Sequence, residues 1–162
     1  YHFEMLIRYT LKDNRIYIDY TIKNNDEDDL YFGFGQHPAF NCPLVKDKDF
    51  SDYWVEFEKE DVEGCRLELS YELFEKYPTY IIKDPKSHVF TLSDGENKVV
   101  MYTDEKYTLF ALWTPMAPFV CLEPWVNNLN LMDESLPFEQ MKENVCLKPG
   151  EVYEIVYSFA II

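Results

Sequence analysis

Two short motifs each place one proton-transfer side chain among rigid and aromatic neighbours. His37 stands in His-Pro-Ala-Phe at 37–40, and Glu123 stands in Leu-Glu-Pro-Trp at 122–125. Histidine titrates near neutral pH and suits a general acid or base. A carboxylate that aromatic rings shield from water becomes a stronger base than a solvated one. The two motifs therefore predict a site for paired acid/base chemistry.

Each of these residues also has a structural interpretation. His37 could pack against Phe34 and Phe40 and hydrogen-bond a backbone carbonyl, and the residues alone leave the two interpretations equally open. Glu123 could form a buried salt bridge with one of the 15 lysines and arginines. Because burial of a carboxylate costs several kcal/mol, the residues favour a functional role for Glu123.

The cysteines and the other histidines give no metal-ligand spacing. Four cysteines stand far apart without a C-x-x-C pair: Cys42, Cys65, Cys121 and Cys146. His2 and His88 lie in the start segment and in a charged loop. We expect free thiols and neither a zinc site nor a redox pair. Cys121 is expected to pack as a small hydrophobic side chain, and a nucleophilic role for it lacks a histidine nearby in sequence.

The charge of the chain excludes two classes of partner. The 30 acidic residues outnumber the 15 basic ones, giving a formal net charge of -15. Such a field repels nucleic acids and anionic membranes, so we expect neither as a partner. No apolar run approaches the ~20 residues of a membrane span, and these residues show no basic start followed by the apolar segment of a signal peptide. Together with free thiols, this predicts a cytoplasmic location.

Hydrophobic residues alternate with polar ones in nearly every regular segment, which predicts an all-β protein. Residues 1–11 and 16–22 flank a turn at 12–14 and predict a hairpin. Further strands are expected at 30–34, 53–58, 65–69, 80–82, 89–92, 99–103, 108–113, 119–122 and 153–161. Helices are expected to be few. The strand spacing predicts a sandwich or barrel, with residues 1–162 forming a single domain.

The two candidate residues must be positioned by strand ends and loops. Pro38 holds His37 in extended geometry, and Gly33 and Gly35 before it permit close backbone approach. Aromatic residues form 17% of the chain. They suit cross-strand packing, and they would equally suit stacking on a sugar ring.

Three segments resemble the aldose 1-epimerases, and within them the LacX-like branch. These are Gly-Gln-His-Pro-Ala-Phe-Asn-Cys-Pro-Leu at 35–44, Leu-Trp-Thr at 112–114 and Phe-Val-Cys-Leu-Glu-Pro-Trp at 119–125. The opening segment 3–24 and Leu-Lys-Pro-Gly-Glu at 147–151 are also similar. The similarity thus runs the length of the chain.

The resemblance implies a galactose mutarotase-like β-sandwich that interconverts the α and β anomers of a hexose without cofactor or metal. By position, Glu123 matches the general base of the family and His37 its general acid. The expected sugar contacts are Gln36, Phe40, Trp113 and Trp125.

The chain also departs from the pattern that the resemblance implies. Relatives usually carry a further His and an Arg in an N-terminal half that has no counterpart here. We therefore expect a partial sandwich, the C-terminal part of a longer protein with N-terminal strands missing. Gln36 stands where relatives often have Gly, and 126–130 replaces their usual loop after Glu-Pro-Trp.

Two other functions remain open. The chain could be a carbohydrate-binding module without turnover, as the unusual Gln36 and the loop at 126–130 would allow. It could also be an inactive fragment that needs its N-terminal half. Exposed strand edges would then favour pairing with that half or with another copy of the chain.

Overall fold

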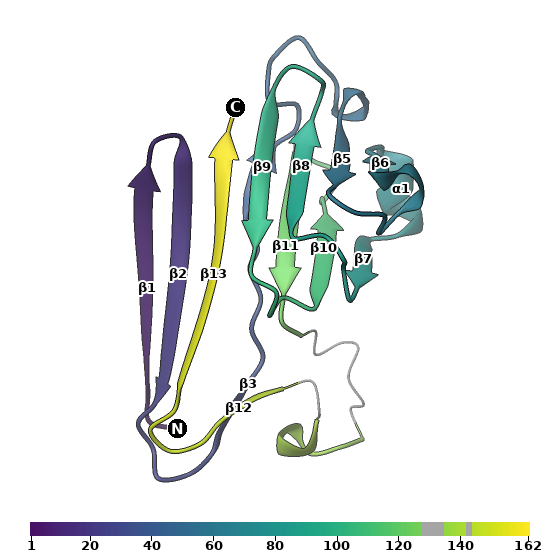
Figure 1. Ribbon diagram of the computed structural model, residues 1–162. Coiled ribbons are helices and arrows are strands. Elements are labelled where there is room, and N and C mark those ends of the chain that lie inside the picture. Colours follow the sequence, from purple (N-terminus) through teal and green to yellow (C-terminus); the bar gives the residue numbers. More distant parts are fainter. Residues whose placement is uncertain (128–134, 142–143) are drawn as a thin grey trace.

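The alternating segments form strands nearly everywhere that the sequence predicts them. The computed structural model describes residues 1–127, 135–141 and 144–162. In these residues, antiparallel strands build two facing sheets, with a single short α-helix at one side (Figure 1). The all-β class is therefore confirmed.

The larger sheet has seven strands in the order β1-β2-β13-β9-β8-β5-β6. Their bounds are β1 (Phe3–Lys12), β2 (Arg15–Asn24), β13 (Val152–Ile161), β9 (Lys98–Thr103), β8 (Val89–Ser93), β5 (Trp54–Phe57) and β6 (Arg66–Glu68). The predicted hairpin is present as β1 and β2, which pair in register from Phe3–Asn24 to Lys12–Arg15. Asp13 in its turn has a φ of 55°, a conformation that aspartate tolerates better than most residues.

The smaller sheet carries both candidate motifs. Its order is β4-β11-β10-β7, with β4 (Ala39–Asn41), β11 (Phe119–Trp125), β10 (Leu109–Trp113) and β7 (Thr79–Lys83). A separate two-stranded sheet pairs β3 (Leu30–Phe32) with β12 (Val145–Leu147). The three-residue strands β4 and β12 were not predicted, because so short a run shows no alternation.

The helical segments are short. α1 (Tyr71–Lys76) begins after Ser70, whose hydroxyl accepts a hydrogen bond from the Leu73 amide. The 3-10 turns are η1 (Phe50–Asp52), η2 (Glu63–Cys65) and η4 (Phe138–Gln140). Among the residues described, no helix has the length and apolarity that crossing a bilayer requires.

The core lies between the two sheets and is rich in aromatic rings. Phe90 on β8 stacks on Phe110 on β10, with ring centroids 3.6 Å apart. Phe159 on β13 meets Phe40 on β4 edge to face. Because these pairs join strands of different sheets, they hold the smaller sheet at a fixed position against the larger one.

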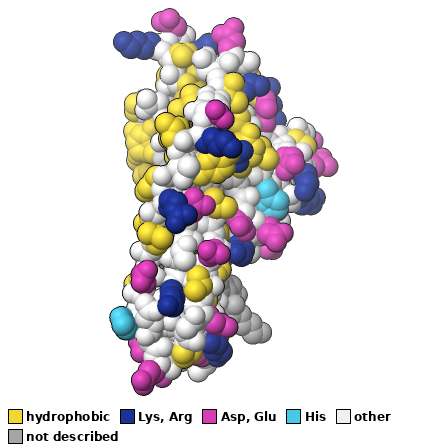
Figure 2. Space-filling model, turned by 60° about the vertical axis from the view of Figure 1, so that its left-hand side comes forward, with side chains coloured by type: hydrophobic (Ala, Val, Ile, Leu, Met, Phe, Trp, Pro, Cys, Tyr) yellow, Lys and Arg dark blue, Asp and Glu magenta, His cyan; other side chains and the backbone are white. Residues whose placement is uncertain are grey.

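Strand β1 is an edge whose apolar side chains remain exposed. By register, its odd-numbered residues share the face of Ile18, Tyr20 and Ile22, which are buried on β2. Figure 2, turned toward this edge, shows hydrophobic side chains interspersed with charged ones. The exposed fractions are 50% for Phe3, 42% for Met5 and Ile7, 69% for Tyr9 and 72% for Leu11. Pairing of this edge with a second copy stays a prediction.

We expect that pairing to be antiparallel, with Leu6 on the two-fold axis. Glu4 would then face Arg8 of the partner subunit, and Met5 would face Ile7 of the partner subunit, so charge and apolar surface both match. Ile7→Lys should raise the dimer dissociation constant at least ~10-fold, because an edge lysine opposes strand pairing. Sedimentation equilibrium measures it, with Tyr77→Lys as an exposed aromatic control far from β1. A monomeric wild-type chain at all concentrations would contradict this prediction.

Candidate acid/base site

His37 is held beside Glu123 by a continuation of the β4–β11 pairing. Cys121 pairs with Ala39 in the last regular step of that ladder. Beyond it, the Leu122 amide donates to the Pro38 carbonyl at 3.2 Å, and the Gln36 amide donates to the Pro124 carbonyl at 3.0 Å. These two bonds bracket His37 and place it directly across from Glu123, although 86 residues separate the two along the chain.

The two side chains are in contact. His37 Nε2 lies 3.4 Å from Glu123 Oε1, and the exposed fractions are 61% for the histidine and 1% for the glutamate. Across the described residues, no lysine or arginine nitrogen lies within 4.0 Å of the Glu123 carboxylate, so the salt-bridge interpretation finds no partner there. The His37 ring meets Trp113 edge to face at 5.4 Å rather than Phe34 or Phe40. The arrangement is a solvent-facing imidazole above a buried carboxylate.

Burial makes the carboxylate a proton acceptor near neutral pH. Loss of solvation raises the pKa of Glu123 to about 7, and the neighbouring Trp125 indole lowers it in part. Its cross-strand neighbour on β10 is the small Ala111. Within the described chain, Glu123 Oε1 accepts no hydrogen bond, so its lone pairs are available.

The raised pKa predicts that stability falls as pH rises. The folded chain keeps the Glu123 proton up to about pH 7, whereas the unfolded chain loses it near 4.5, so folding weakens between these values. Glu123→Gln removes this penalty and should stabilise the fold by up to about 3 kcal/mol near pH 8, with a smaller gain near pH 5. Urea unfolding at the two pH values measures it. The exposed Glu75→Gln is the control, and equal pH dependence of wild type and Glu123→Gln would contradict the assignment.

Cys121 joins the pair on the same face of β11, two residues before Glu123. One donor atom each from His37, Cys121 and Glu123 lies within 4.8 Å of the others. Burial and the Glu123 carboxylate raise the pKa of the Cys121 thiol to about 12, which opposes a nucleophilic role. The sequence predicted packing for Cys121 and disfavoured a nucleophilic role because no histidine lies nearby in sequence, whereas the fold brings His37 beside it. Strand alternation could have found it, because residues two apart share a face.

Trp113 and Trp125 flank the pair. Trp113 lies across from Cys121 on β10 and is half-buried. The Trp125 indole donates to the Gln36 carbonyl at 3.2 Å. A Cβ on Gly35 would lie 2.6 Å from Trp125 Cδ1, so this position requires the close approach that only glycine allows. Both tryptophans lie beside the His37–Glu123 pair, where they could form the wall of a sugar-binding site. Their role as sugar contacts stays a prediction.

Gln36 and Phe40 have side chains directed into the core. Gln36 is 7% exposed, and its Oε1 accepts a hydrogen bond from the Tyr20 hydroxyl at 2.6 Å. Phe40 packs on Phe159 of the larger sheet. The structure therefore does not bring these two predicted sugar contacts to the His37–Glu123 pair.

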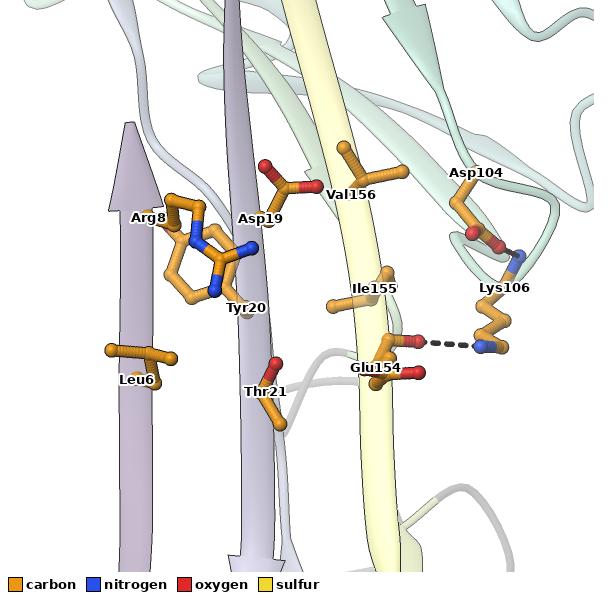
Figure 3. A pocket seen from close by; sticks show the side chains of 10 residues that line it. All are labelled: Leu6, Arg8, Asp19, Tyr20, Thr21, Asp104, Lys106, Glu154, Ile155 and Val156. Carbon is orange, nitrogen blue, oxygen red and sulfur yellow. Dashed lines mark hydrogen bonds between the residues drawn. The ribbon is translucent and has the colours of Figure 1, made fainter. Parts of the chain in front are cut away.

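A separate surface hollow lies on the larger sheet. Figure 3 shows it between β1, β2 and β13, with Arg8, Asp19 and Glu154 among its lining side chains and Lys106 at its rim. Its volume is about 290 Å³. Neither His37 nor Glu123 lines it, so it is distinct from the candidate acid/base site.

The loop after Glu-Pro-Trp is described only at its start. Asn127 Oδ1 accepts a hydrogen bond from the Phe34 amide at 3.0 Å, which ties the loop to the segment before His37. Residues 128–130, the rest of the loop predicted to differ from relatives, lie outside the described residues.

The fold is a sandwich of two sheets, and one face of its smaller sheet carries the His37 imidazole beside the buried Glu123 carboxylate. The chain belongs to the aldose 1-epimerase family, whose family model matches residues 1–160. It is similar to the plasmid-encoded protein LacX of Lactococcus lactis, at 26% identity over 100% of this chain and 63% of LacX.

Solved structures show the same fold. A galactose mutarotase-like protein from Lactobacillus casei superposes with a TM-score of 0.80 at 20% identity, over 99% of this chain and 63% of that protein. A galactose mutarotase related enzyme from Lactobacillus acidophilus gives 0.82 at 20% identity, over 99% and 61%. The galactose mutarotase-like fold is therefore confirmed, and the chain spans under two thirds of the length of these relatives.

Proposed function

We propose that this chain interconverts the α and β anomers of a hexose by acid/base ring opening. Membership of the aldose 1-epimerase family supports the substrate class and the reaction. The observation that carries the proposal is the contact between Glu123 Oε1 and His37 Nε2 at 3.4 Å. The C1 hydroxyl oxygen must lose a proton and the ring oxygen O5 must gain one. Both oxygens are bonded to C1, so a base and an acid in contact with each other can reach both.

In the proposed mechanism Glu123 removes the proton from the hydroxyl on C1. The electron pair of that O–H bond forms the C1 carbonyl, the C1–O5 bond breaks, and O5 takes a proton from the His37 imidazolium. Rotation about C1–C2 turns the other carbonyl face toward O5. Ring closure with the roles reversed returns both protons and gives the opposite anomer, so no cofactor or metal enters the balance.

The burial pattern suits these roles. Glu123 is shielded, which strengthens it as a base, whereas His37 is 61% exposed and can exchange protons with water between turnovers. The rings of Trp113 and Trp125 lie beside the pair and would stack against the apolar face of the sugar. We expect a small-molecule hexose as the partner.

The pH dependence of the reaction tests the base. Because Glu123 acts in its ionised form and has a pKa of about 7, kcat/KM should fall about tenfold per pH unit below that value. Polarimetry of freshly dissolved α-glucose, corrected for uncatalysed mutarotation, gives the profile. A catalysed rate that stays constant down to about pH 5 would contradict a base with a raised pKa, because it would require a group that titrates as low as an ordinary solvated carboxylate.

Binding without turnover remains the alternative function. It drew support from Gln36, yet the Gln36 side chain lies in the core, hydrogen-bonded to Tyr20, and so adds no polar group beside His37. Sugar titration distinguishes the two functions, since a binding module would show saturable binding without anomer exchange. Neither binding nor exchange would indicate a fragment that needs the remainder of its protein.

A further inference from the structure

The His37–Cys121–Glu123 cluster has the donor set of a transition-metal site. It offers one imidazole nitrogen, one thiol sulfur and one carboxylate oxygen, all within 4.8 Å of one another. In a tetrahedral zinc site with bonds of about 2.0–2.3 Å, neighbouring donor atoms lie about 3.3–3.7 Å apart. The 3.4 Å between His37 Nε2 and Glu123 Oε1 already falls in that range.

The Glu123 carboxylate is available to bind a cation. Glu123 is 1% exposed and its Oε1, which points at His37, has no hydrogen-bond partner in the described chain. A buried carboxylate without a compensating group is costly. A divalent cation held by a carboxylate, a thiolate and a neutral imidazole forms a site of zero net charge, which removes that cost.

Access and overall charge also favour a cation. His37 faces solvent and leaves an entry path to the buried donors. The net charge of -15 raises the local concentration of cations around the chain. We propose that His37, Cys121 and Glu123 bind one Zn²⁺ ion from solution, with a fourth position left to water and the Cys121 proton released to solvent.

Such binding would regulate the site by occupying it. The same Nε2 and Oε1 atoms cannot bind Zn²⁺ and transfer protons, so the ion would act as a reversible inhibitor. This consequence rests on the proposed function, whereas metal binding itself does not. The two can therefore be tested separately.

The test is a titration of the reduced, metal-free 162-residue chain with Co²⁺, a spectroscopic substitute for Zn²⁺. Binding should produce a thiolate-to-cobalt charge-transfer band that saturates at one equivalent and is displaced by Zn²⁺. Cys121→Ser should abolish the band and weaken Zn²⁺ binding at least ~10-fold in competition with a chromophoric chelator. Cys146→Ser, at a half-buried thiol elsewhere, is the matched control and should keep both.

His37→Asn provides a second variant that does not depend on the folding of Cys121→Ser. The position is 61% exposed, so the fold should tolerate the change, and Zn²⁺ affinity should again fall at least ~10-fold. No band in the wild type, a band that survives Cys121→Ser, or unchanged affinity in His37→Asn would overturn the proposal. If the chain catalyses anomer exchange, saturating Zn²⁺ should suppress that exchange. If the metal-free chain shows no exchange, that result counts against the proposed function and leaves the metal titration unaffected.

Discussion

Glu123→Gln is expected to lower the catalysed rate of anomer exchange at least ~10²-fold. The amide has the shape of the carboxylate but cannot accept a proton from the C1 hydroxyl. Burial raises the pKa of Glu123 to about 7, so the wild-type residue is a far stronger base than any solvated carboxylate that could replace it. Saturation-transfer or polarimetric rates at equal protein concentration measure the loss.

The variant should remain folded, which separates lost chemistry from lost structure. The desolvation cost of a buried carboxylate is removed, so the midpoint of thermal unfolding near pH 8 should not decrease. Glu75→Gln, at an exposed position on α1, should keep the wild-type rate. A folded Glu123→Gln protein with a rate close to wild type would show that the base is another residue.

His37→Asn is the second large effect, with a predicted loss of at least ~10²-fold. Asparagine can hydrogen-bond the ring oxygen O5 but cannot deliver a proton to it. The loss should appear in kcat more than in KM, because proton delivery matters in the transition state and little in ground-state binding.

The histidine position allows a clean comparison. His37 is 61% exposed, so its replacement should leave the unfolding transition unchanged. His2→Asn changes an exposed histidine far from the pair and should have no effect on the rate. Equal rates for His37→Asn and wild type would mean that water or another group supplies the proton.

The alternation of residue types predicted most of the fold. It placed the hairpin and the long strands of both sheets, and these are observed. It ended one strand at 122, whereas β11 continues to Trp125 and holds Glu123 in its interior. It missed β4 and β12, which contain too few residues to show a period. Alternation placed the odd-numbered residues of β1 on one face, namely Phe3, Met5, Ile7, Tyr9 and Leu11. It could not show that β1 lies at an edge where that face is exposed, because strand order depends on contacts distant in sequence.

The sequence predicted part of the candidate site, and the two-residue period of strands explains which residues share its face. His37 and Glu123 were identified, and the register of β4 on β11 brings them together. Alternation also implies that Gln36, adjacent to His37, points to the opposite face, and the structure places it there. Alternation places Cys121 on the same face as Glu123, and the register of β4 on β11 then sets a histidine from 84 residues earlier beside both.

The most direct test of the central claim is NMR saturation transfer between the α and β anomeric protons of glucose and galactose with this chain added. The account predicts transfer above the uncatalysed rate with the wild type and none above it with Glu123→Gln. No transfer from a folded wild-type sample, or equal transfer in the variant, would contradict a working acid/base pair at His37 and Glu123.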